Sequence, residues 1–154
     1  SFYEDTYSLY NLYRFAHYYE EAYGKYIWLK SGASLVIEHT EAMTVIDVNT
    51  GSVLKKKKQE DTLFYQINRE AAKEIARQLR LRNISGIIMI DFINMKDTAQ
   101  KEKLLSLLDS ECKKDRVHCN VIDMTALNLV EMTRSKVRKP LHEQIRSCMK
   151  NNRS

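Results

Sequence analysis

Three short runs of apolar and β-branched residues follow one another in the first third of the chain. They occupy residues 26–30, 34–39 and 42–48, with the sequences "YIWLK", "SLVIEH" and "AMTVIDV". Runs of this length and composition are typical of strands, and the brief polar breaks between them predict antiparallel hairpins. Before them, residues 8–23 place apolar positions at helical spacing. We expect this tyrosine-rich helix to pack on the domain, with stacking on nucleic-acid bases as the alternative.

Helical patterns alternate with strand patterns in the rest of the chain. Residues 61–83 form the longest one, and residues 97–114 predict a second helix. The residues that mark the apolar face of the first pattern are Phe64, Ile67, Ala71, Ile75 and Leu79. Residues 137–148 predict a last helix, in which Pro140 must lie in the first turn because it has no backbone N–H to donate.

The strand patterns between and after these helices complete the fold prediction. "SGIIMID" at 85–91 is apolar at both alternating sets of positions, which is typical of a central parallel strand. Residues 117–124 and 127–133 predict two further strands. A length of 154 residues suits one domain with a substantial core. The pattern predicts a single α/β domain over 1–154, with a mixed sheet flanked by helices.

Charge and cysteine content narrow the classes of protein. The net charge of +5 and the pI of about 9.0 are compatible with binding to nucleic acid or anionic lipid. The cysteines, Cys112, Cys119 and Cys148, are odd in number and form no CxxC pair, so we expect free thiols in a reducing, cytoplasmic compartment. A zinc site from Cys112, His118 and Cys119 is the alternative, but their spacing matches no standard ligand pair. No apolar run approaches the ~18 residues of a membrane span.

Two strand patterns end in an aspartate followed closely by an asparagine. They are "MTVIDVNTG" at 43–51 and "IIMIDFINM" at 87–95. Side chains alternate between the faces of a strand, so Asp47 and Asn49 point to the same side. Asp91 stands at the carboxyl end of its strand, where open α/β sheets bind ligands. If the two strands run parallel as neighbours, the carboxylates of Asp47 and Asp91 meet at one edge of the sheet.

Two neighbouring carboxylates at the edge of a core repel each other unless a cation lies between them. Mg²⁺ suits such a pair, because it takes one or two carboxylates and fills its other positions with water or phosphate oxygens. Carboxylates about 4–5 Å apart can share one Mg²⁺ at ~2.1 Å from each. Such an ion can activate water against a phosphodiester. The alternative is that both aspartates are ordinary strand-end turn residues.

At these residues the sequence resembles the catalytic region of the ribonuclease E / ribonuclease G family. The similarity extends over most of the chain rather than over one short motif. It comprises "WLKSG" (28–32), "TEAMTVIDVNTG" (40–51), "EAAKEIARQLRLRNISGIIMIDFINM" (70–95), "KDRV" (114–117) and "ALNLVEMTR" (126–134). The long central segment is too distinctive for a chance similarity.

The resemblance implies a Mg²⁺-dependent endoribonuclease that cuts single-stranded RNA in RNA processing and decay, with Mn²⁺ as an alternative ion. It implies that Asp47 and Asp91 bind the metal, and that Asn49 positions the attacking group, so that these three residues form the catalytic set. It also implies a subdomain with a deoxyribonuclease I-like fold and a homo-oligomeric whole protein.

Basic residues within or beside the matching segments are the candidates for RNA contact. They are Lys30, Lys55, Lys56, Arg80, Arg82, His118 and Arg134. Two readings stay open for this set. The lysine run at 55–58 is also explained as solvated charge, and Arg80, Arg82 and Arg134 are also explained as residues that serve helix ends.

The chain departs from the family pattern in several ways. Asn94 replaces the second aspartate of "IDFIDM", His118 replaces a basic residue, and Ala33 replaces a glycine. We expect the S1-type, 5′-end-sensing, RNase H-like and zinc-link regions to be absent, and therefore no zinc in this piece and weak or no activity from it alone. The alternatives are a non-catalytic RNA-binding or assembly module with a vestigial metal site, and an unrelated α/β domain.

Overall fold

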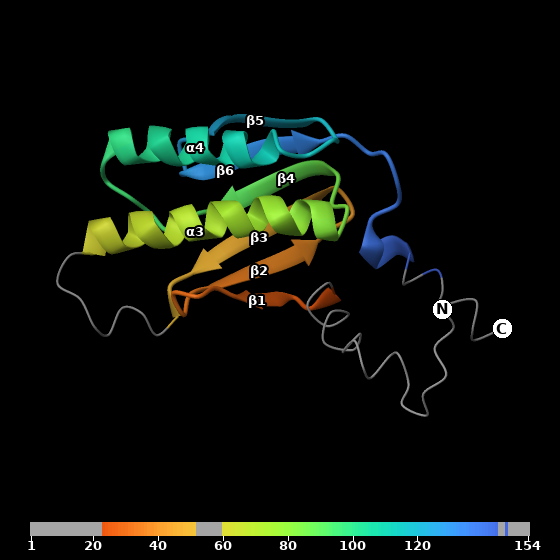
Figure 1. The fold of residues 1–154 in the computed structure, drawn as a ribbon, viewed down its shortest axis with the longest axis horizontal. Coiled ribbons are helices and arrows are strands. Elements are labelled where there is room, and N and C mark those ends of the chain that lie inside the picture. Colours follow the sequence, from red (N-terminus) through yellow and green to blue (C-terminus); the bar gives the residue numbers. More distant parts are fainter. Residues whose placement is uncertain (1–22, 52–59, 145–146, 148–154) are drawn as a thin grey trace, which may run out of the picture.

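A computed structural model describes residues 23–51, 60–144 and 147 (Figure 1). Most of the tyrosine-rich stretch 8–23, the candidates Lys55 and Lys56, and Cys148 lie outside these residues. The elements along the chain are β1 (Tyr26–Trp28), β2 (Ser34–His39), β3 (Met43–Asn49), α3 (Glu60–Leu81), β4 (Gly86–Asp91), α4 (Thr98–Cys112), β5 (Cys119–Met124) and β6 (Leu129–Arg134).

The six strands form one mixed sheet in the order β1-β2-β3-β4-β6-β5. Within the described residues, β3 and β4 are parallel, and the other neighbouring pairs are antiparallel. A parallel pair needs a long crossover connection, and the 22 residues of α3 supply it. The mixed α/β sheet agrees with the sequence prediction and is compatible with a deoxyribonuclease I-like subdomain.

The helices α3 and α4 lie on one face of the sheet (Figure 1). The predicted apolar face of α3 packs there, with Ile67, Ala71, Ile75 and Leu79 buried and Phe64 partly buried. Alternate strand residues meet it from below, and Ile46, Ile88 and Ile90 are fully buried. Each such isoleucine contributes about 1.5–3 kcal/mol through removal of its side chain from water. The core is therefore a single layer between the helices and one sheet face.

The opposite sheet face, which we call the open face, is covered by no helix of the described part of the chain. This differs from the prediction for 85–91, whose two apolar faces suggested burial on both sides. β4 is central and parallel to β3 as expected, but Ile87 is 50% exposed and Asp91 is exposed. The open face therefore carries the side chains that can meet a ligand.

The end of the described chain also differs slightly from prediction. The last helix begins at Leu141 rather than at 137, directly after Pro140. The carbonyl of Pro140 accepts the N–H groups of Glu143 and Gln144 at 3.1 and 3.2 Å, so the proline stands at the helix start where its missing N–H costs nothing. The N–H of Leu141 donates to the carbonyl of Arg82, which joins this helix to the end of α3.

Candidate metal centre and nucleic-acid interface

Asp47 and Asp91 are direct partners in the parallel β3–β4 ladder. The residues just before them, Ile46 and Ile90, are also partners and are fully buried on the helix side. Because side chains alternate along a strand, the two aspartates point to the open face. Neighbouring strands lie about 4.7–4.9 Å apart. The two carboxylates therefore project side by side from the carboxyl ends of adjacent strands, the arrangement expected from the sequence.

Asn49 lies on the same face as Asp47, two residues further along β3. Its side-chain amide donates a hydrogen bond to Oδ2 of Asp47 at 2.7 Å. This bond orients the Asp47 carboxylate and leaves its other oxygen without a partner from Asn49. The strand thus stays regular to Asn49, as the shared orientation of the two side chains requires.

Glycine at position 51 allows the chain to turn just beyond Asn49. Gly51 has a positive φ of +57°, and a Cβ there would lie 2.7 Å from the carbonyl oxygen of Gly32. A side chain would therefore be strained twice, by its backbone conformation and by contact with another backbone. The close approach brings the turn between β1 and β2, which contains Lys30, next to the end of β3.

The electrostatics of the pair favour a bound cation. Burial, and then the negative charge of Asp47, raise the pKa of Asp91 above its ordinary value. No hydrogen bond or ion pair joins the Asp91 carboxylate to another side chain of residues 23–51 or 60–144. A cation between the two aspartates would remove their repulsion and complete the coordination that the protein leaves open.

The donor set fits Mg²⁺ better than a metal that needs a closed protein cage. In the described part of the chain, no group of three or more His, Cys, Asp or Glu side chains is arranged to hold a metal ion. What β3 and β4 provide is two carboxylates, with the amide of Asn49 beside them. Mg²⁺ is bound by one or two carboxylates and otherwise keeps water or takes phosphate oxygens, so two protein ligands suffice.

Asn68 supports this edge of the sheet and was not singled out from the sequence. It is fully buried on α3, donates to the carbonyl of Ile93 at 2.7 Å and accepts the N–H of Ile93 at 3.0 Å. The two bonds hold the segment that follows Asp91. The signal in the sequence was an amide beside Ile67 within the apolar pattern of the helix, where a polar residue must find partners.

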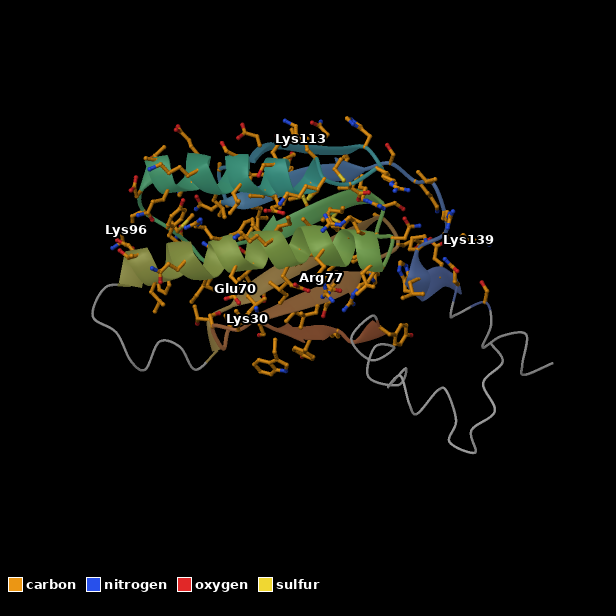
Figure 2. All side chains as sticks on the ribbon, viewed as in Figure 1. Lys30, Glu70, Arg77, Lys96, Lys113 and Lys139 are labelled. Carbon is orange, nitrogen blue, oxygen red and sulfur yellow. The ribbon has the colours of Figure 1, made fainter. Side chains whose placement is uncertain are left out.

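The candidate RNA-binding residues separate between the two ends of the sheet. Lys30 is exposed and lies at the end that carries Asp47 and Asp91, where Glu70 of α3 accepts the backbone N–H groups of Lys30 and Ser31 at 2.7 and 3.2 Å (Figure 2). The remaining described candidates lie at the opposite end, about 16 Å away along β4. They are Arg80, Arg82, His118 and Arg134.

Two of these distant candidates are buried. Arg82 is 4% exposed, and its Nε donates to the side-chain oxygen of Gln78 at 2.6 Å. Arg134 is also 4% exposed, so both side chains are almost completely enclosed in this structure. His118 and Arg80 are exposed, and Arg80 donates to the carbonyl of Glu111 at 3.3 Å.

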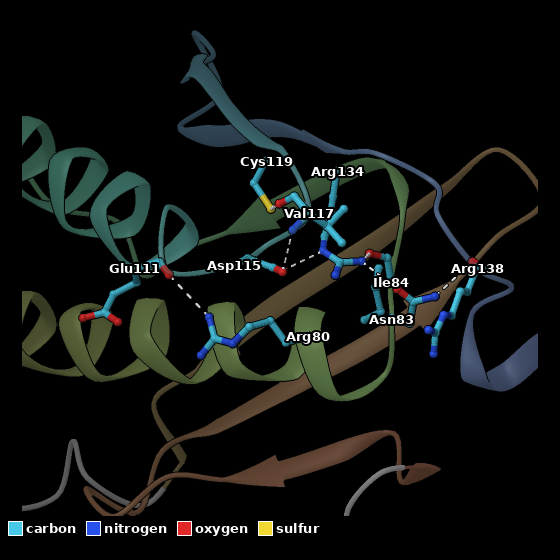
Figure 3. Close-up of polar contacts among 9 residues, drawn as sticks. All are labelled: Arg80, Asn83, Ile84, Glu111, Asp115, Val117, Cys119, Arg134 and Arg138. Atoms are coloured by element: carbon cyan, nitrogen blue, oxygen red, sulfur yellow. Dashed lines mark hydrogen bonds and ion pairs between the residues drawn. The ribbon is translucent and has the colours of Figure 1, made fainter.

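Arg134 instead holds the start of β4 together (Figure 3). Its guanidinium donates to Asp115 at 3.0 Å, to the side chain of Asn83 at 3.0 Å and to the carbonyl of Ile84 at 2.9 Å. Burial alone would raise the pKa of Asp115, but the N–H of Val117 and the charge of Arg134 outweigh it and hold this pKa below its ordinary value. The role of Arg134 in this structure is to close a buried network.

Comparison with known proteins agrees with the resemblance seen in the motifs. The model of the Ribonuclease E/G family matches residues 1–137. Ribonuclease G of Escherichia coli (strain K12) is 45% identical over 122 residues, which cover 79% of this chain and 25% of the relative. Ribonuclease G of Haemophilus influenzae is 42% identical over 139 residues, 90% of the chain and 28% of the relative.

A relative named ribonuclease E shows a similar degree of identity. Ribonuclease E of Nostoc sp. is 42% identical over 115 residues, which cover 75% of this chain and 17% of the relative. The chain therefore spans between 17% and 28% of the length of these curated relatives. None of the described helices is long and apolar enough to cross a membrane.

Proposed function

The chain belongs to the ribonuclease E/G family, and from that premise we propose that it carries the metal centre of a Mg²⁺-dependent endoribonuclease. Its reaction is the hydrolysis of phosphodiester bonds in single-stranded RNA, in cytoplasmic RNA processing and decay. The observation that carries the proposal is the direct pairing of Asp47 with Asp91 at the carboxyl ends of two parallel strands. The longer protein acts as a homo-oligomer.

Each polar residue of the site has a defined part in this proposal. Asp47 and Asp91 hold one Mg²⁺. Mn²⁺ can take the place of Mg²⁺, because both ions accept oxygen ligands. The bound ion supplies a more acidic water and neutralises charge on the phosphodiester. Asn49 fixes the orientation of the Asp47 carboxylate through its 2.7 Å bond and has a carbonyl oxygen left to position the attacking water.

The charge of the site makes RNA binding depend on the metal. Without a cation, Asp47 and Asp91 present two negative groups to the phosphates of the substrate. Lys30 is the described cationic candidate at this end of the sheet. We therefore expect the isolated chain to bind RNA weakly when magnesium is removed by a chelator, and more tightly when it is restored.

A thermal-stability titration with Mg²⁺ tests the metal centre. An ion that binds only the folded chain stabilises it by about 2.7 kcal/mol at a concentration of 100 Kd. We expect the melting temperature of the wild-type chain to rise with Mg²⁺ and with Mn²⁺. The rise should vanish in Asp47→Asn and in Asp91→Asn, because each substitution removes one charged ligand while keeping the size of the side chain.

Asp123→Asn is the matched control, since Asp123 is an exposed aspartate of the same sheet, on β5. It should keep the full response. If the wild-type chain shows no response at millimolar Mg²⁺, or if Asp123→Asn loses it as the other two do, the metal centre is not at Asp47 and Asp91. The chain would then be better described as a non-catalytic RNA-binding or assembly module.

A further inference from the structure

The edge strand β1 exposes two large aromatic side chains. Tyr26 is 61% exposed and Trp28 is 73% exposed, whereas Ile27 between them is 7% exposed and lies in the core. Tryptophan is among the most buried residues of folded proteins on average. Two neighbouring aromatic rings turned toward water on one strand therefore suggest a surface for another molecule rather than a packing element.

The sheet register places both rings on the open face with the candidate metal centre. Tyr26 pairs with Val36, which pairs with Asp47. Trp28 pairs with Ser34, which pairs with Asn49. Partners in adjacent strands share a face, and two strand spacings amount to about 10 Å. The aromatic pair thus lies two strands from Asp47 and three strands from Asp91 on the same face, a separation that a short piece of extended polynucleotide can span.

A groove with basic walls runs along the same edge. A cavity of about 800 Å³ lies between β1 and α3, and Tyr26 and Trp28 form part of its lining. Its other charged lining residues are Lys30, Lys73, Arg77, Arg80, Glu70 and Glu74.

Its cations outnumber its carboxylates, and the carboxylates are already engaged. Glu70 accepts two backbone N–H groups, and Glu74 accepts from Arg77 at 2.8 Å and from Gln78 at 2.7 Å. Such a groove favours a polyanion. It lies on the helix side of β1, and the exposed side chains of Tyr26 and Trp28 lie on the other side of this edge strand, on the open face. A charged groove joined to stacking surfaces is the combination that binds single-stranded nucleic acid.

We propose that Trp28 and Tyr26 form a stacking platform for unpaired bases of single-stranded RNA that crosses the edge strand β1, with phosphates in the basic groove on the helix side and bases on the open face. The platform rests on the proposed function in one respect: it places a nearby phosphodiester of the same strand at Asp47 and Asp91. It also supplies a physical basis for the choice of substrate. Unpaired bases offer free faces to an aromatic ring, whereas bases in a duplex are stacked on each other.

The intrinsic fluorescence of the chain reports on this platform directly, because Trp28 is the single tryptophan in the sequence. The 154-residue chain is titrated with a short unstructured RNA, with the same RNA as a duplex, and with inorganic polyphosphate. We expect saturable quenching of Trp28 by the single strand and little quenching by the other two probes. Equal quenching by polyphosphate would show that charge alone is recognised, and would overturn the proposal.

Substitutions measure the contribution of stacking to affinity. Anisotropy of a labelled single strand gives Kd for Trp28→Ala, for Trp28→Phe and for Leu127→Ala, a control at another highly exposed apolar residue. Stacking of one base predicts that Trp28→Ala weakens binding by about 5- to 140-fold. Trp28→Phe should recover most of the affinity, and Leu127→Ala should equal wild type. Unchanged affinity in Trp28→Ala would overturn the platform.

Two further outcomes separate this inference from the metal centre and from self-association. Asp47→Asn should lose the Mg²⁺ response yet keep the quenching of Trp28 by the single strand. If the wild-type chain shows quenching by RNA but no metal response, the proposed metal centre is contradicted and the stacking platform is not. A shift of Trp28 emission that depends on protein concentration without RNA would place a second copy of the chain on this edge strand, and would overturn the RNA platform.

Discussion

The two ends of β4 differ in how their charged side chains are paired. At the amino end, Gly86 pairs with Arg134 of β6, and the guanidinium of Arg134 is neutralised by Asp115 with side chains only 3% and 8% exposed. At the carboxyl end, Asp91 pairs with Asp47. One end joins opposite charges in the interior, and the other sets like charges beside each other on the open face.

The pKa values of the two carboxyl groups respond accordingly. The pKa of Asp115 lies below its ordinary value, because the N–H of Val117 and the charge of Arg134 overcome the effect of burial. The pKa of Asp91 lies above its ordinary value, because burial and the charge of Asp47 act in the same direction. A compensated carboxylate of this kind supports the fold, whereas an uncompensated pair destabilises it and is better explained by a ligand.

The largest effect is expected at the compensated end. Arg134→Met should lower the free energy of unfolding by about 3–5 kcal/mol, because it leaves the buried Asp115 charge and the carbonyl of Ile84 without their partner. Urea denaturation measures the change. Lys113→Met is the control, since its pair with Asp109 is exposed and should matter by no more than about 1 kcal/mol. Equal losses in both variants would contradict the comparison.

An intermediate effect is expected from pH, with opposite signs at the two ends. The stabilisation from Asp115 is present above the unfolded pKa of about 3.9 and is lost as pH falls through its lower folded pKa. The contribution of Asp91 is present below about pH 3.9 and is lost as pH rises through its higher folded pKa. Melting temperatures measured from acid to neutral pH without Mg²⁺ should show the loss of the Asp115 contribution in acid and the loss of the Asp91 contribution as the pH rises.

Substitution assigns each part of this pH profile. Asp91→Asn should be more stable than wild type at neutral pH without metal, and the difference should disappear below about pH 4. Asp115→Asn should be less stable at neutral pH and should flatten the loss of stability in acid. A neutral-pH destabilisation by Asp91→Asn would mean that this carboxylate is compensated by a contact within the fold.

The smallest effect on stability is expected at Asn49. Its exposed bond to Asp47 contributes little to folding, so Asn49→Ala should change the free energy of unfolding by no more than about 0.5 kcal/mol. The same bond orients a proposed metal ligand, and loss of such a bond typically costs 10–100-fold in metal affinity. Mg²⁺ affinity from the concentration dependence of the melting temperature tests this, and wild-type affinity in the variant would remove Asn49 from the site.

Much of the local structure could be predicted because it depends on short-range periodicity. The apolar and β-branched composition of 34–39 and 42–48 predicted β2 and β3 to within a residue, and the apolar face of 61–83 matches the buried side of α3. The parallel approach of Asp47 and Asp91 was also expected, because a helix between two strands favours a parallel return. Their roles in metal binding stay a prediction.

Long-range placement could not be predicted from these patterns. Arg82 and Arg134 were candidates for RNA contact, because a basic residue looks the same in sequence whether it faces solvent or a buried carbonyl. Trp28 was assigned only to a strand, because which two strands form the edges of a sheet depends on the order of all six strands. Asn68 was missed because its partner, Ile93, is 25 residues away.

By itself the sequence determined which segments are helices and strands, and which two strands end in aspartate, because side-chain spacing and backbone preference act between near neighbours. Only the tertiary structure decided that Asp47 and Asp91 share a face with Trp28, while Arg134 is enclosed at the other end of the sheet. That division follows from strand order and register, and these are set by the burial of one common core rather than by any single segment.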